Sequence, residues 1–179
     1  METRDEALTA FDEAHGLFVA AYEHVPDEAL SFLKPGDDYA LGGLVAHARG
    51  VVEHYRMVLE TLVASDFGET RAVDPPGFWE TVGAEAKRGL EPAERERAFE
   101  NLASQHRRFV ATASGLAASD WERKADVFYG DATEVYATSP ADVCGWLVAH
   151  YLEHLPHLDE LLGDWRSAAG TGGPASPEP

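Results

Sequence analysis

Two histidines near the end of the chain have the spacing of metal ligands. His150 and His154 are four residues apart in the segment His150-Tyr-Leu-Glu-His154. In a helix, both imidazoles of such a pair project from one face, about 6 Å apart along the axis. Both can then reach one ion at about 2.0–2.1 Å. The pair therefore predicts part of a site for a divalent metal.

A third imidazole can come from another helix. His47 and His54 are seven residues apart, at one edge of an apolar stripe, where either can face a cleft shared with the later pair. They are about 10.5 Å apart along a helix axis, so only one of them can readily join the same ion. The spacing alone leaves both as alternatives. Three neutral nitrogen ligands leave room for an outside molecule, as in catalytic metal sites.

Other metal chemistries fit the sequence less well. His150-x-x-Glu153-His154 matches the inverted zinc-protease pattern, but those enzymes take a third ligand far downstream and only 25 residues follow His154. A ferritin-like di-iron site needs Glu-x-x-His pairs, and the chain has none. Cys144, the single cysteine, precedes His150 by six residues and is poorly placed on the same helix face. The histidine set remains the best candidate.

Composition narrows the classes of partner. The 179 residues carry a formal net charge of −18, from 14 Lys+Arg against 32 Asp+Glu. Because nucleic-acid affinity depends on cations that neutralise phosphates, this charge argues against DNA or RNA and against an anionic membrane surface. The chain has no apolar run long enough to span a bilayer and no signal-peptide core. With its single cysteine, it is expected to be a cytoplasmic protein.

Four amphipathic helices are expected to position these histidines. Apolar residues recur at three- and four-residue steps in four segments, and Ser139-Pro140-Ala-Asp142 is a clear start for the last. Asp37 or Asp38 is expected to cap the second helix. The predicted spans are about 5–25, 39–64, 92–115 and 139–166. They predict an all-α fold, a four-helix bundle with long connections between helices 2 and 3 and helices 3 and 4.

The connections and the end of the chain carry weaker signals. A short helical piece is expected at 78–82, and residues 116–138 are either a hairpin or an ordered loop. Connections of about 25 residues are uncommon without a function, so we expect them to cover one end of the bundle. Residues 1–166 are expected to form one domain, followed by a flexible tail at 167–179.

The two histidine segments resemble the motifs of a known superfamily. Tyr39-Ala-Leu-Gly-Gly-Leu-Val-Ala-His47 and His150-Tyr-Leu-Glu-His-Leu-Pro-His157 are similar to the first and second motifs of the DinB-like (YfiT-like) metalloproteins. There, a histidine early in helix 2 and a pair late in helix 4 hold a divalent metal in a four-helix bundle. The resemblance implies His47, His150 and His154 as ligands. It also implies that His157, where the family often has Gln or His, supports the site without binding the ion.

This resemblance covers about residues 5–166, and the sequence departs from the family pattern in two places. Pro156 lies inside the last predicted helix, where it removes the hydrogen bond to the carbonyl of Leu152 and is expected to kink the helix. On the sequence alone, His54 also stays an alternative third ligand.

The resemblance implies an enzyme that uses one divalent metal, Zn, Ni or Fe. Such a cation can lower the pKa of water or ionise a thiol. Some members of the superfamily resemble transferases or isomerases that use a low-molecular-weight thiol such as bacillithiol or mycothiol, and others are described as metal-dependent hydrolases. The leading expectation is a transferase that activates a small thiol for attack on a small-molecule substrate, with hydrolysis as its closest variant.

A rival expectation belongs to another class of protein. It is a non-catalytic metal-binding bundle, or a stress-linked interaction protein without a metal. Arg49 and Arg56, considered as anchors for an anionic thiol, are expected to be surface residues. Trp146, one turn before His150, either lines a substrate pocket or packs in the core, and core packing is the favoured alternative. The family resemblance is also compatible with a homodimer that forms through an exposed pair of helices.

Overall fold

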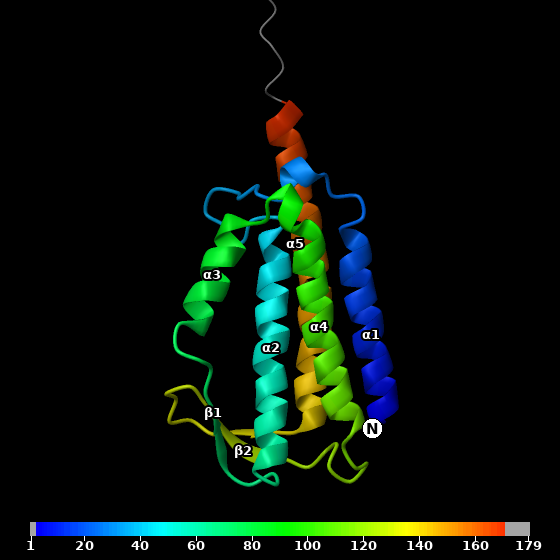
Figure 1. Ribbon diagram of the computed structural model, residues 1–179, viewed down its shortest axis with the longest axis vertical. Helices are drawn as coiled ribbons and strands as arrows, with labels where there is room; N and C mark the ends of the chain where they lie inside the picture. The colour runs from blue at the N-terminus through cyan, green and yellow to red at the C-terminus, as the bar shows by residue number, and fades with distance from the viewer. Residues whose placement is uncertain (1–2, 171–179) are drawn as a thin grey trace, which may run out of the picture.

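The computed structural model describes residues 3–170, which form five α-helices and a small sheet. The helices are α1 (Arg4–Ala21), α2 (Gly43–Ala64), α3 (Phe78–Arg88), α4 (Arg95–Ser114) and α5 (Pro140–Gly170). The strands are β1 (Thr70–Ala72), β2 (Ala125–Tyr129) and β3 (Tyr136–Thr138). Short 3-10 turns, η1 (Asp27–Ala29) and η2 (Pro92–Glu94), lie in the connections. Figure 1 shows the long helices side by side, α3 outside α2, and the sheet across the lower end.

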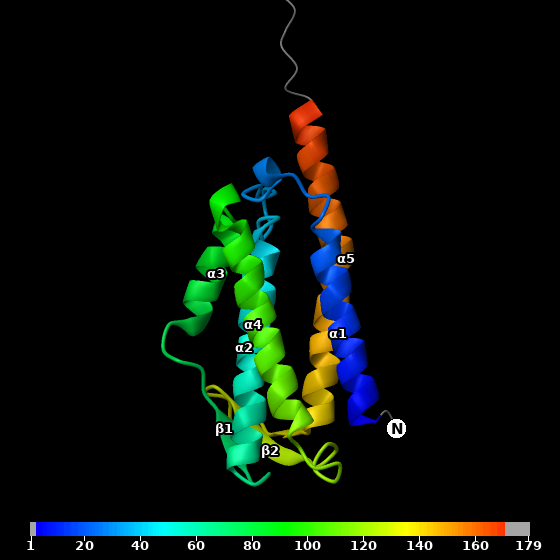
Figure 2. The same cartoon turned by 45° about the vertical axis from the view of Figure 1, so that its right-hand side comes forward.

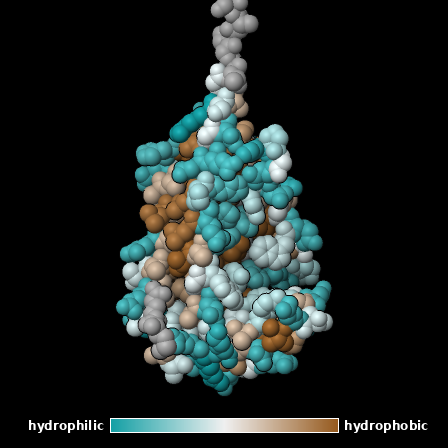
Figure 3. All heavy atoms as spheres, turned by 180° about the vertical axis from the view of Figure 1, so that it is seen from behind, coloured by the Kyte–Doolittle hydropathy of each residue, from teal (hydrophilic) through white to brown (hydrophobic). Residues whose placement is uncertain are grey.

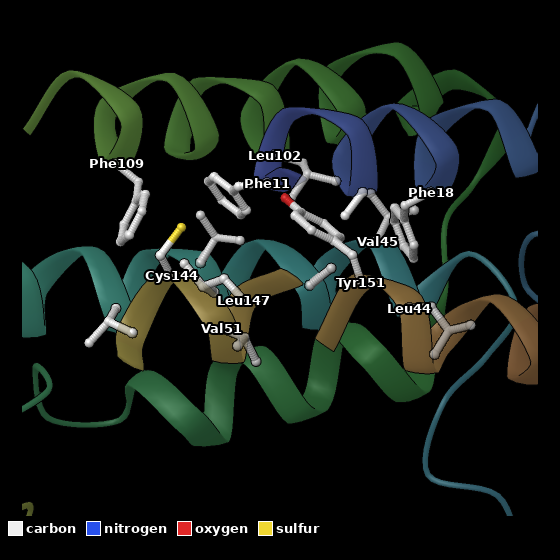
Figure 4. Packing of buried hydrophobic residues seen from close by; sticks show 14 of the residues in the cluster. Phe11, Phe18, Leu44, Val45, Val51, Leu102, Phe109, Cys144, Leu147 and Tyr151 are labelled. Atoms are coloured by element: carbon white, nitrogen blue, oxygen red, sulfur yellow. The ribbon is translucent and has the colours of Figure 1, made fainter. Parts of the chain in front are cut away.

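The four long helices form two layers. Helix α1 packs mainly on α5, and α2 mainly on α4, while α2 also contacts α5 across the boundary that we call the seam. Figure 2 shows α1 with α5 on one side and α2 with α4 on the other. Phe11, Val51, Leu102 and Leu147, one from each helix, meet in the core between the layers (Figure 4). Burial of each such side chain stabilises the fold by about 1.5–3 kcal/mol.

The start of α5 confirms the prediction at Ser139. The backbone N–H of Asp142 donates to Ser139 Oγ (3.1 Å), and the backbone N–H of Ser139 donates to Asp142 Oδ2 (2.8 Å). These reciprocal bonds satisfy donors that a helix end otherwise leaves free. Helix α5 continues through Pro156 to Gly170. Four residues of the expected tail are therefore helical, and 171–179 lie outside the described residues.

The prediction of an all-α four-helix bundle is wrong. Helix α3 is a fifth helix, longer than the short piece expected at 78–82. The three strands form a mixed sheet, in which β2 pairs in parallel with β1 and antiparallel with β3. Residues 116–138 thus contain two paired strands, whereas β1 was not expected at all. A strand of three residues has no readable periodicity, and its partner lies far along the chain.

Helix α3 lies against α2 through two glycines on one face. A Cβ atom on Gly43 would lie 1.7 Å from the carbonyl oxygen of Ala86, and one on Gly50 would lie 2.7 Å from methyl carbons of Val82. The backbone N–H of Ala40 also donates to the Ala86 carbonyl at 2.8 Å. The absence of side chains at both glycines therefore sets how closely α3 approaches.

One face of the molecule is mostly hydrophilic. Figure 3 shows the molecule from behind, where hydrophilic residues dominate around a smaller hydrophobic area. No helix between residues 3 and 170 combines the length and the apolar character that a bilayer span requires.

A pair of stacked histidines, of which His106 is buried and His15 half-buried, lies between α1 and α4. The ring of His106 is 4.0 Å from that of Phe11 and 4.2 Å from that of His15, between centroids. Nε2 of His106 lies 2.7 Å from Asp12 Oδ1, which is an acceptor for its N–H. Within the described residues, His15 Nε2 and Tyr151 OH are buried without a hydrogen-bond partner. Burial lowers the pKa of His15 from 6.5 to about 4.

Acidification is expected to destabilise the fold through His15. Because the folded protein has the lower pKa, the unfolded chain binds the proton first as the pH falls. The contribution to the free energy of unfolding is intact above about pH 6.5 and should fall by about 2 kcal/mol towards pH 4, allowing for partial solvent access. Urea unfolding between pH 7 and 4.5 measures the slope, which should be shallower in His15→Gln. The exposed His24, changed to Gln, should keep the wild-type slope; identical slopes in all three proteins would contradict this assignment.

Candidate metal centre

Three histidines from α2 and α5 meet at the seam. One ligand nitrogen from each of His47, His150 and His154 lies within 4.8 Å of the others. The ring of His47 is 4.9 Å from that of His150 and 5.1 Å from that of His154, between centroids. The two rings on α5, one helical turn apart, are 4.5 Å from each other. The structure thus brings together the three side chains that the sequence predicted as ligands.

The three nitrogens suit a divalent metal. Nε2 of His150 is buried and has no hydrogen-bond partner among residues 3–170. A buried polar atom without a partner costs about 1–3 kcal/mol, and a bond to a metal would satisfy it. Two nitrogens bound to one ion are at most about 4.2 Å apart. Small ring rotations would therefore convert separations of up to 4.8 Å into a coordinating set.

Burial keeps these imidazoles in the form that binds metal. Desolvation lowers the pKa of His47 and of His150 to about 4. The pKa of His154 falls to about 3, because desolvation is reinforced by repulsion from the neighbouring imidazoles. All three are therefore neutral near pH 7, and neutral imidazole is the ligand form. No proton has to leave before an ion binds.

His54 does not join this cluster. Its Nδ1 lies 2.7 Å from Asp74 Oδ1, in the connection between β1 and α3. The other carboxylate oxygen, Oδ2, accepts a hydrogen bond of 2.7 Å from the indole N–H of Trp79. Asp74 therefore orients two rings at once, and the structure places His47 rather than His54 beside the α5 pair. The sequence contained no signal for this role of Asp74.

His157 lies beside the cluster and is held by a carboxylate. Its Nε2 is 3.0 Å from Asp37 Oδ2, while Asp37 Oδ1 accepts a hydrogen bond from the backbone N–H of Tyr39. Asp37 therefore organises this loop and does not cap α2, which begins at Gly43 after Gly42. The Tyr39 ring lies 4.6 Å from His47 and 5.7 Å from His157, between centroids. Tyr39 is the first residue of the motif that ends at His47, but no role was expected for it from the sequence.

Two cavities open beside the histidines. One, of about 400 Å³, lies between α2, α3 and α5, and His150 is part of its wall. The other, of about 460 Å³, includes His47 and Tyr39, and Trp79 belongs to both walls. Trp146 is 40% exposed and lines the first cavity, so the structure shows the pocket alternative for this residue and not the favoured alternative, packing in the core. The first cavity is lined by Val51, His54, Tyr55, Trp79, Trp146, Ala149, His150 and Glu153.

Neither arginine considered as an anchor is available to an anionic ligand. Arg49 is paired with Glu53 at 3.1 Å and with Glu85 at 2.8 Å. Arg56 is buried, contrary to expectation, and donates to Glu60 at 2.6 Å and to Gln105 at 3.0 Å. Both guanidinium groups therefore bind side chains of α2 and of a neighbouring helix, α3 for Arg49 and α4 for Arg56.

The likeness to DinB-like metalloproteins rests on the two histidine segments. No protein-family model and no curated protein matches this chain. Membership of this superfamily therefore stays a prediction, and a function has to be inferred from the site itself.

Proposed function

We propose that this protein is a divalent-metal-dependent enzyme in which His47, His150 and His154 hold the ion. The proposed reaction is transfer of a low-molecular-weight thiol to a small electrophile. A bond from sulfur to the electrophilic carbon forms, the bond from that carbon to its leaving group breaks, and the thiol proton passes to a base of the protein. The observation that carries the proposal is the meeting of three neutral imidazoles beside an open cavity. Structural zinc sites normally use four protein ligands, whereas catalytic sites keep one position open. Among residues 3–170, no fourth histidine, cysteine or carboxylate belongs to the group.

The bound metal would supply a positive charge that favours the anionic form of a thiol. The chain's own residues would provide the rest of the site. Because Asp74 Oδ1 accepts the Nδ1–H of His54, the Nε2 lone pair of His54 is left free to accept the thiol proton. His54 lines the same cavity as His150, so this acceptor lies on the substrate side. The aromatic residues of this cavity would form the wall beside the reacting groups.

Thiol consumption tests the proposal. Untagged protein is loaded in turn with Zn, Ni and Fe(II) and mixed with bacillithiol, mycothiol or a simpler thiol and a generic electrophile such as monobromobimane. We expect a metal-dependent loss of thiol that falls at least about 100-fold in His47→Ala, because the ion is no longer held.

The exposed His24 provides a matched control, and His24→Ala should keep the full rate. Equal rates in wild type, His47→Ala and protein-free buffer would contradict thiol transfer. If the loaded protein instead hydrolyses an ester or amide and leaves the thiol untouched, water is the nucleophile and the transferase proposal is replaced by a hydrolase.

A further inference from the structure

The cavity beside His150 is bordered by a continuous series of aromatic rings. The ring of Trp79 is 5.4 Å from that of His54, His54 is 4.9 Å from Tyr55, and Tyr55 is 5.5 Å from Trp146, between centroids. All four line the same cavity of about 400 Å³. These separations are typical of interacting aromatic side chains. Three helices therefore contribute one aromatic wall.

The tryptophans at the two ends of this wall are exposed, and one of them is held in place. Trp79 is 42% exposed and Trp146 is 40% exposed. The indole N–H of Trp79 donates to Asp74, and the same carboxylate binds His54. Asp74 thus fixes two adjacent rings before any ligand arrives. Exposed aromatic faces that are already oriented favour stacking of a planar ligand, because little side-chain freedom remains to be lost.

Charges near the cavity disfavour an anion. Glu153 is the charged residue of its lining, which contains no lysine or arginine, and the Asp74 carboxylate is bonded to two of the rings. On α2, Arg49 is already paired with Glu53 and Glu85. A negative ligand would be repelled here, whereas a cation would be attracted by the carboxylates and by the ring faces.

We propose that this cavity binds the electrophilic substrate, and that the substrate is a planar aromatic molecule without negative charge. Its ring system stacks among Tyr55, Trp79 and Trp146, with the reacting group on the side of His150. The word substrate rests on the function proposed above. The binding of an aromatic ring to this wall needs no metal.

Three quinolines of similar size test the proposal on the metal-free, full-length chain. Quinoline is neutral, N-methylquinolinium is a cation, and quinoline-4-carboxylate is an anion. The chain has four tryptophans, so the ¹⁵N-labelled protein gives four indole N–H signals, assigned through single Trp→Phe variants. We expect the neutral and cationic probes to shift the signals of Trp79 and Trp146 and to leave those of Trp121 and Trp165 in place. The anion should bind at least about tenfold more weakly.

A matched pair of variants on α5 separates the cavity from the general surface. Trp146→Ala should weaken binding of the neutral probe about tenfold, whereas Trp146→Phe keeps a ring and should retain most of it. Leu152→Ala is the control, because Leu152 is 41% exposed on the same helix and lies outside the cavity lining. Equal effects of the two alanine variants, or an anion that binds as tightly as the cation, would overturn the proposal.

Metal uptake is measured on the same protein in a separate titration, so that the aromatic site and the metal site are tested independently. Aromatic binding without metal uptake would contradict the proposed enzyme but would still support an aromatic ligand for the cavity. Metal uptake without aromatic binding would contradict the aromatic ligand and leave the metal site supported.

Discussion

Replacing His150 with alanine is expected to abolish tight metal binding. Untagged wild-type protein should hold close to one divalent ion per chain, and His150→Ala should lose at least about 100-fold in affinity. The expected loss is large because only three residues form the group and because Nε2 of His150 has no other partner within the described residues. Elemental analysis after dialysis measures the stoichiometry, and calorimetric titration with Zn measures the affinity.

Neighbouring histidines provide the controls for this experiment. His54→Ala should still bind one ion per chain, because His54 is engaged by Asp74 outside the cluster. His157→Ala should weaken binding about tenfold, since His157 flanks the ligands without joining them. If His54→Ala lost as much metal affinity as His150→Ala, His54 would also be a ligand and the proposed ligand set would be wrong. Wild-type protein that takes up none of Zn, Ni or Fe would end the metal and enzyme proposals together.

Gly43→Ala is expected to destabilise the fold by about 3 kcal/mol or to displace α3. The new Cβ would lie 1.7 Å from the Ala86 carbonyl oxygen, a backbone atom that cannot rotate away. Separation of the helices would also break the hydrogen bond from Ala40 to the same carbonyl. Urea unfolding measures the stability, and the indole signal of Trp79 on α3 reports displacement.

Gly16→Ala is the matched control for this substitution. Gly16 lies within α1, and a Cβ there would meet nothing within 4 Å. This variant should be more stable than wild type by about 0.5–1 kcal/mol, because alanine is the better helix former. If Gly43→Ala had wild-type stability and an unchanged Trp79 signal, the close contact between α2 and α3 would be contradicted.

The long helices could be predicted because the signals that define a helix lie within the helix's own sequence. Apolar residues repeat over many turns of α2 and α5, and the Ser139–Asp142 cap marks the start of α5 within four residues of sequence. The sheet could not be predicted in this way. Strand β1 has three residues and is defined by pairing with β2, and nothing within β1 itself records that partner. The predicted all-α class was wrong because it left out this sheet.

The same distinction applies to the site. His150 and His154 follow from helical spacing alone, and the family resemblance added His47. The contact that holds His54 apart from them could not be predicted, because it depends on where Asp74 lies. That position follows from the path of the chain between β1 and α3, which is set by long-range contacts. Trp146 was a similar case, because whether it lines a cavity or packs in the core depends on α2 and α3, which complete that cavity.

The seam has a consequence for the lifetime of the protein. His47 belongs to the α2/α4 layer and the α5 pair to the other, so a bound ion would cross-link segments far apart in sequence. Opening of the two layers would then require that the ion be released first, and ions that bind only the folded state slow or disfavour unfolding. If the proposed ion binds at the seam, newly made copies without it would open more readily and be degraded first. Cellular abundance of the chain would then follow the supply of that ion.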